Sequence, residues 1–168
     1  MRLFLDLDDT LIHATRHDLH RIPEPDYKIE LEVPYSVFLR PDIELLVPHS
    51  FSIFTAASES YMAVHLEQLR RRGYQVQEGF SREHMVSGEP IYRGPAVLID
   101  DLGTNTVGVT RKLACLPQGH HVQVARFTIQ RIIPRDLTFK QKVACMKLAR
   151  YQLHIQAGTT LEEALLEV

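Results

Sequence analysis

Short apolar runs separated by polar stretches dominate the first two thirds of the chain. Residues 3–5, 51–54 and 96–99 are almost entirely apolar, and each run is too short to be a buried helix. Such runs are typical of strands covered on both faces, as in a parallel sheet. Residues 58–72 follow the second run and predict a helix that Ser58 can cap. This order predicts an α/β fold with a central parallel sheet flanked by helices.

Alternation of apolar and polar residues marks a second kind of strand. Residues 27–33 alternate in this way, which predicts a half-buried strand. After a turn at residues 34–36, residues 37–39 can return as its hairpin partner. We expect the remaining elements to be a polar loop at 13–26, a helix that opens at 40–41, a strand at 74–77, an irregular segment at 78–95, a helix at 105–116 and a strand at 121–125.

Helical spacing returns near the C-terminus. Phe139, Val143, Met146 and Leu153 recur at this spacing, with Lys140, Lys142, Lys147 and Arg150 on the remaining surface. The pattern predicts a core-packed helix with a solvated basic face. Residues 160–163, TLEE, form a capping box that should start a last short helix.

Size and composition indicate an ordinary globular protein. The 168 residues, 45% hydrophobic and 24% charged, suit a single domain spanning 1–168. No apolar run is long enough to span a bilayer, so we expect no membrane partner. The first strand begins at residue 2 and leaves no room for a signal peptide, so we expect a cytoplasmic or otherwise intracellular location. A net charge of −2 does not by itself indicate a nucleic-acid binder.

Carboxylates follow two of the apolar runs. Asp6 and Asp8 come after the first run, and Asp100 and Asp101 end the third. Like charges in a partly dry site repel one another, so a fold tolerates such clusters mainly where a cation or a reaction uses them. Mg²⁺ is the natural partner because it is a small, hard cation that prefers carboxylate and phosphate oxygens. Two acidic strand ends in a parallel sheet therefore predict a magnesium site at one edge.

A hydroxyl residue and two small residues end the second apolar run. Thr55 and Ala56 come at the carboxyl end of the predicted strand, where free backbone N–H groups can accompany the hydroxyl. This combination favours the binding of phosphate oxygens.

These motifs, taken in order, resemble those of the haloacid dehalogenase (HAD) superfamily. Within it, the closest likeness is to the FCP/SCP-like phosphatases, which act on the C-terminal domain of RNA polymerase II. Residues 6–13, DLDDTLIH, resemble that group's DLDETLVH. The same holds for residues 38–41, FLRP, for residues 54–58, FTAAS, and for residues 98–101, LIDD.

The resemblance implies a role for each motif residue. Asp6 would be the nucleophile and a metal ligand, and Asp8 the general acid and base with its backbone carbonyl on the metal. Thr55 and Ala56 would bind the phosphoryl group, and Asp100 and Asp101 would complete the metal site. The superfamily also uses a Lys or Arg between its second and fourth motifs. Residues 29–111 contain no lysine, so we assign this role to Arg93, with Arg82 second and residues 70–72 as further alternatives.

The expected function is Mg²⁺-dependent hydrolysis of a phosphomonoester through an aspartyl-phosphate. The predicted loops are too short for a large cap domain, and an open site suits a phosphate on a macromolecule, most simply a phosphoprotein. Two alternatives stay open, namely a polynucleotide 5′- or 3′-phosphatase and a non-catalytic phosphate-binding module on the same fold. The sequence does not indicate the oligomeric state.

Overall fold

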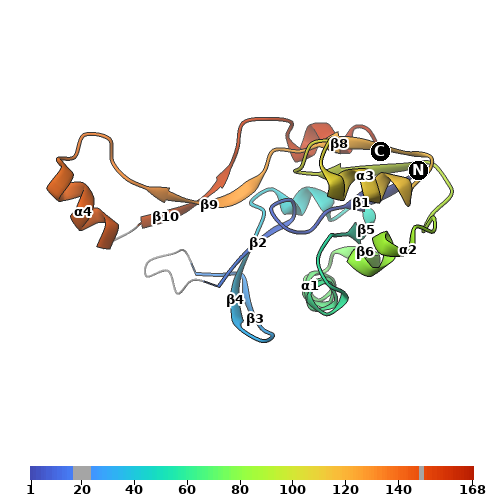
Figure 1. The fold of residues 1–168 in the computed structure, drawn as a ribbon, viewed down its shortest axis with the longest axis horizontal. Coiled ribbons are helices and arrows are strands. Elements are labelled where there is room, and N and C mark those ends of the chain that lie inside the picture. Colours follow the sequence, from blue (N-terminus) through green and yellow to red (C-terminus); the bar gives the residue numbers. More distant parts are fainter. Residues whose placement is uncertain (17–23, 148–149) are drawn as a thin grey trace.

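Five parallel strands form the main sheet of the molecule (Figure 1). The computed structural model describes residues 1–16, 24–147 and 150–168. The strand order is β6-β5-β1-β7-β8. The three apolar runs are strands of this parallel sheet, as the sequence predicts, and the structure makes them neighbours, in the order β5, β1 and β7. The strands are β1 (Arg2–Leu5), β5 (Ser50–Phe54), β6 (Gln75–Phe80), β7 (Ala96–Asp100) and β8 (Gly119–Gln123).

Helices cover both faces of this sheet, which confirms the predicted α/β class. Leu3 and Leu5 of β1 share one face and pack into a buried cluster with residues of α1 and α5. Phe4 lies between them in sequence and faces the other way, where it packs with residues of α2 and α3. Among the described helices, none has the length and apolar character needed to cross a membrane. The helices are α1 (Glu59–Arg71), α2 (Arg82–Ser87), α3 (Val107–Ala114) and α5 (Leu161–Leu165).

The direction of sheet growth reverses beside β1. The chain first adds β5 and β6 on one side of β1 and then crosses over to add β7 and β8 on the other. The carboxyl ends of neighbouring strands diverge at such a reversal and leave a crevice where ligands bind in open α/β sheets. The residues that follow β1, β5 and β7 therefore meet at one edge.

A small antiparallel sheet, β2-β4-β3, stands beside the main one (Figure 1). Its strands are β2 (Ile12–Thr15), β3 (Tyr27–Glu30) and β4 (Pro34–Leu39). The predicted hairpin is confirmed, but its turn lies at residues 31–33, because Pro34 begins β4 opposite Glu30. The expectation of a loop from residue 13 is wrong at its start, since β2 is held by pairing with the distant β4. Residues 17–23 of that expected loop lie outside the described residues.

Two further local predictions need correction. The helix expected after residues 40–41 is a single 3₁₀ turn, η1 (Ile43–Leu46). The segment expected to be irregular contains the end of β6 and helix α2, which Ser81 and His84 start with a capping box. His84 takes the place that Glu or Gln usually fills in this motif, so the usual sequence signal was missing.

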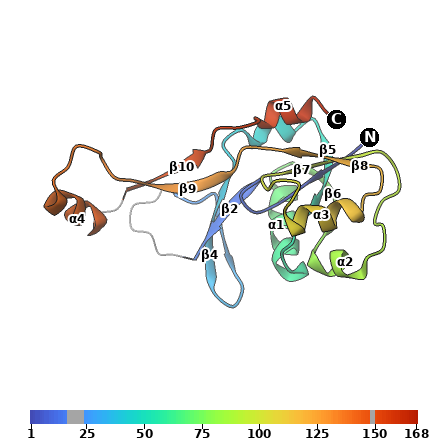
Figure 2. The same cartoon turned by 45° about the horizontal axis from the view of Figure 1, so that its top comes forward.

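Residues 127–155, here called the arm, project away from the main sheet in both views (Figures 1 and 2). The arm consists of the antiparallel pair β9 (Phe127–Ile132) and β10 (Arg150–Ile155) with α4 (Phe139–Lys147) at its far end. The prediction of a core-packed helix reaching Leu153 is wrong, because Leu153 pairs with Ile129 between the strands and Phe139 is 85% exposed. The capping box that starts α5 is confirmed by the Thr160 and Glu163 bonds.

Candidate active site

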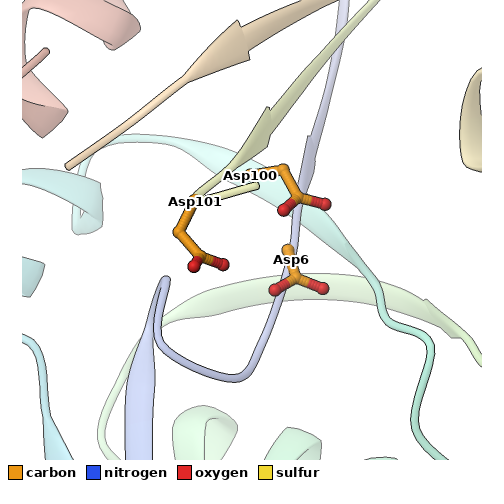
Figure 3. A group of neighbouring side chains, drawn as sticks. All are labelled: Asp6, Asp100 and Asp101. Atoms are coloured by element: carbon orange, nitrogen blue, oxygen red, sulfur yellow. The ribbon is translucent and has the colours of Figure 1, made fainter. Parts of the chain in front are cut away.

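Three carboxylates meet where β1 and β7 end (Figure 3). Asp6 directly follows β1, Asp100 is the last residue of β7, and Asp101 follows it. One oxygen of each lies within 4.8 Å of the others, and all three residues are buried. Burial raises the pKa of Asp6 to about 7, and the nearby Asp100 adds to this effect. The strand ends thus gather negative charge in a place that water hardly reaches.

Lys112 of α3 lies between two of these carboxylates. Its Nζ donates to Asp6 Oδ1 at 2.6 Å and to Asp100 Oδ2 at 2.7 Å. The side chain is 2% exposed. Burial opposes its charge, but the Coulomb attraction of Asp6 and Asp100 outweighs burial and raises the pKa of Lys112. Lys112 is therefore an ammonium group fixed against the carboxylate of Asp6.

Thr10 and Arg126 hold Asp101 on the other side of the group. The Thr10 hydroxyl accepts from the Asp101 backbone N–H at 3.0 Å and lies within hydrogen-bond distance of Asp101 Oδ1 and Asp6 Oδ2. Arg126 Nε donates to Asp101 Oδ2 at 2.5 Å. The buried Arg40 in turn donates to the carbonyls of Thr10 and Ala125, at 3.1 and 2.8 Å. These bonds fix the loop after β1 against residues 125–126, which lead into the arm.

The carboxylate of Asp8 has a different hydrogen-bond partner from that of Asp6. Its Oδ1 accepts a hydrogen bond of 2.7 Å from the hydroxyl of Tyr61, a residue of α1. Burial raises the pKa of Asp8, and the bond from Tyr61 only partly offsets this. A carboxyl group with a raised pKa is suited to donating and accepting protons near neutral pH.

Thr55, which follows β5, lines a cavity together with Asp6 and Asp8. It is buried, and its Oγ1 accepts from the Ala57 N–H at 3.1 Å, which fixes the hydroxyl at the cavity wall. The cavity has a volume of about 360 Å³. Its lining includes Asp6, Asp8, Thr55, Ala56, Asp101, Lys112 and Arg126.

Comparison with known proteins bears on this arrangement. The family model for NLI interacting factor-like phosphatases matches residues 1–95, more than half of the chain. The chain belongs to the NLI interacting factor-like phosphatase family. The matched segment contains Asp6, Asp8 and Thr55, whereas Asp100, Asp101 and Lys112 follow it.

A solved structure is also similar to this family member. It is described as the fission yeast RNA polymerase II CTD phosphatase Fcp1-R271A bound to beryllium fluoride. The TM-score is 0.53 at 17% identity, and the likeness covers 74% of this chain but only 41% of that one. The likeness confirms the predicted HAD fold. The part of the chain that the structure describes contains no large cap domain. No curated protein matches the sequence.

The donor set of this family member fits a divalent cation. Asp6, Asp100 and Asp101 offer only oxygen ligands, which hard ions such as Mg²⁺ prefer. Lys112 and Arg126 offset two of the three carboxylate charges. A cation beside the remaining buried charge would relieve the repulsion that burial strengthens. The Asp8 carboxylate lies outside this group, so its contact with the metal through a backbone carbonyl stays a prediction.

The structure brings most of the predicted site residues together. Asp6, Asp8, Thr55, Ala56 and Asp101 line one cavity, and Asp100 lies beside it. Arg93 does not join them. It is exposed and precedes the first residue of β7, so it lies at the sheet edge opposite the carboxylates. Arg82 lines a neighbouring cleft instead. The cation that contacts Asp6 is thus Lys112, and the expectation that Arg93 lies beside Asp6 is wrong.

Lys112 was not predicted, because the superfamily's cation is expected between the second and fourth motifs and Lys112 follows the fourth. A signal was nevertheless present in the helix predicted for residues 105–116. Val109, Lys112, Leu113 and Leu116 recur at the spacing of one helical face, so Lys112 stands on the apolar side. A lone lysine there needs a buried carboxylate partner. Arg126 and Tyr61 carried no comparable signal.

Proposed function

We propose that this chain hydrolyses phosphomonoesters through an aspartyl-phosphate on Asp6, with Mg²⁺ as cofactor and a phosphoprotein as substrate. The observation that carries this proposal is the placement of Asp6, Asp8, Thr55 and Lys112 around one cavity. A nucleophile, a proton donor and two groups able to hold phosphate oxygens are what the reaction requires.

The first step is the transfer of the phosphoryl group to Asp6. A carboxylate oxygen of Asp6 attacks phosphorus, and the bond between phosphorus and the ester oxygen breaks. The protonated Asp8 gives its proton to the leaving oxygen, which the raised pKa of Asp8 makes possible. Lys112 and the Thr55 hydroxyl stabilise the negative charge on the phosphoryl oxygens.

The second step releases phosphate and restores the enzyme. Asp8, now ionised, takes a proton from a water molecule that attacks phosphorus. The bond between phosphorus and the Asp6 oxygen breaks, so Asp6 leaves as a carboxylate and Asp8 is protonated again. Tyr61 keeps Asp8 apart from Asp6 by holding Asp8 Oδ1 at 2.7 Å.

The ion would be held by Asp6, Asp100 and Asp101. When bound, Mg²⁺ supplies positive charge that lets an anionic phosphate approach an anionic nucleophile. Lys112 contributes a second positive charge to the same place, fixed by its bonds to Asp6 and Asp100.

The surroundings of the cavity support a polypeptide substrate. A cleft of about 560 Å³ shares Asp8 and Ala57 with the cavity and is lined by apolar and polar residues, among them Leu31, Val33 and Tyr35. Such a cleft can hold the side chains next to a phosphorylated residue. The similar Fcp1 structure is described as a CTD phosphatase, which agrees with this substrate class.

Turnover of three substrates tests the proposal. We expect Mg²⁺-dependent hydrolysis of p-nitrophenyl phosphate, loss of activity with EDTA, and higher kcat/KM for a phosphoserine peptide than for a 5′-phosphorylated oligonucleotide. Asp6→Asn should lower kcat by at least about 1000-fold, because the amide cannot act as nucleophile. Asp136→Asn, an exposed change on the arm, serves as the matched control.

Three results would contradict, one each, the proposed substrate class, the proposed metal and the proposed catalytic activity. Preference for the oligonucleotide end would replace the phosphoprotein by a polynucleotide. Full activity with EDTA would exclude the metal. Absence of turnover on every phosphomonoester, in a folded protein, would favour the non-catalytic module.

A further inference from the structure

Charge is distributed unevenly between the arm and the rest of the molecule. Six of the 19 Lys and Arg residues lie in residues 127–155, but only one of the 21 Asp and Glu residues does. The arm therefore carries a charge of +5 and the remainder of the chain −7, although the total is only −2. A separation of this size creates a local positive potential that the net charge conceals.

Four cations of the arm are without an ion pair among the residues the structure describes. Arg135, Lys140, Lys142 and Arg150 make no ion pair with any of these residues, and all but the half-buried Lys142 are exposed. They are spread along the far half of the arm, from β10 to α4. Such cations are available to a partner that carries charge along its length.

The basic cluster at residues 70–72, in contrast, has partners within the protein. Arg70 donates to the carbonyls of Val76 and Gln77, and Arg71 pairs with Glu67. Arg72 donates to Gln68 and to the carbonyl of Asp26. These three guanidinium groups are already engaged within the body of the protein, so the cluster is not a comparable surface.

An exposed aromatic ring accompanies the free cations. Phe139 begins α4 and is 85% exposed, and Lys142 and Val143 lie on the same side of the helix, three and four residues on. A ring exposed to this degree is accessible to a partner. Bases of a single-stranded nucleic acid stack on such rings while lysines hold the backbone phosphates.

We propose that the arm binds single-stranded nucleic acid, with Phe139 as a stacking platform and Arg135, Lys140, Lys142 and Arg150 as phosphate contacts. The ring distinguishes this partner from an acidic protein segment, which would match the charge but has no bases to stack. The arm lies outside the cavity of Asp6, so this binding is separate from phosphate hydrolysis.

The test measures binding of a fluorescent 20-nucleotide single strand that has a 5′-hydroxyl end. Without a terminal phosphate, this probe offers no monoester to the Asp6 cavity. We expect tight binding at 50 mM salt that weakens steeply as salt is added. Lys140→Gln with Arg150→Gln should weaken binding at least about tenfold and reduce the logarithmic salt slope by about 1.4, because two phosphate contacts are lost.

The matched control removes two exposed charges from the body, Lys28→Gln with Arg71→Gln, and should leave affinity within about twofold. Phe139→Ala should weaken binding about tenfold through lost stacking, with little change in salt slope. Circular dichroism and the thermal midpoint check that every variant is folded.

Several outcomes would overturn the proposal. These are no binding at 50 mM salt, equal loss in the arm and body variants, or no effect of Phe139→Ala. Equally tight binding of a polyglutamate peptide would identify an acidic protein as the partner instead. Association of the chain with itself that the arm variants abolish would assign the surface to a second copy.

Discussion

Lys112 joins two carboxylates that would otherwise repel each other. Asp6 and Asp100 are both buried, and the Lys112 ammonium lies 2.6 and 2.7 Å from them. At the scale of single residues, this contact links stability to function. The same charge that permits two buried carboxylates is the one that would attract a phosphate.

Replacing Lys112 should therefore reduce both properties. We expect Lys112→Met to lower the free energy of unfolding by about 3 kcal/mol at pH 7 without divalent ions, because it leaves buried charges uncompensated. It should also lower kcat on p-nitrophenyl phosphate by at least about 100-fold. Urea titration and steady-state kinetics measure the two effects. Lys28→Met, at an exposed position, is the control, and near-normal turnover of Lys112→Met would remove Lys112 from the mechanism.

At the scale of elements, a buried hydrogen bond fastens α1 to the small antiparallel sheet. His65 of α1 is fully buried, and its Nδ1 lies 2.7 Å from the hydroxyl of Tyr27 in β3. Its ring also lies 4.4 Å, centroid to centroid, from that of Tyr61, which holds Asp8. Burial lowers the pKa of His65 from 6.5 to about 4. The neutral ring is thus part of the packing that positions Asp8.

This pKa shift predicts acid sensitivity. Between about pH 6.5 and 4 the unfolded chain binds a proton at His65 that the folded protein does not, so acidification lowers stability. The contribution of His65 to this loss should be about 2 kcal/mol from pH 7 to pH 5. His65→Asn retains an acceptor for Tyr27 but cannot titrate, so its stability should fall about 2 kcal/mol less than that of the wild type.

Urea unfolding at the two pH values, without divalent ions, measures this difference. Asp6 acts with the opposite sign, since its raised pKa makes the folded protein the better proton acceptor between about pH 4 and 7. Comparing the variant with the wild type cancels this contribution. An equal pH dependence in both proteins would show that His65 is already protonated or exposed in the folded state.

At the scale of the whole molecule, the arm is an appendage of a body that holds the candidate site. Among the residues that the structure describes, none from the arm belongs to either of the two buried clusters of the main sheet. The base of the arm contacts the loop that follows β1, where Phe127 N–H donates to the Asp9 carbonyl at 2.7 Å. The body should therefore fold and act without most of the arm.

Shortening the arm tests this division. Ile129 and Leu153 are directly paired, so an Asn-Gly turn can replace residues 130–152 and close the hairpin. We expect a cooperative unfolding transition with a midpoint within about 3 °C of the wild type, a change of about 1 kcal/mol. Hydrolysis of p-nitrophenyl phosphate should stay within about twofold. Loss of folding would show instead that the arm supports the body.

The sequence alone determined the central strands and the residues at their ends. Apolar runs such as residues 3–5 and 96–99 can be satisfied only by burial on both faces, and the residues that follow them must emerge at one sheet edge. The grouping of Asp6, Thr55 and Asp100 therefore followed from local pattern and general topology.

Tertiary structure decided which cation and which partners these residues meet. Lys112 rather than Arg93 reaches Asp6, because the rotation of α3 on the sheet, and not distance along the chain, directs its side chain. Residues 139–153 likewise have helical spacing, yet Leu153 became part of a strand through pairing with Ile129. Local sequence sets the conformations a segment can adopt, whereas contacts between distant segments select one of them and thereby complete the site.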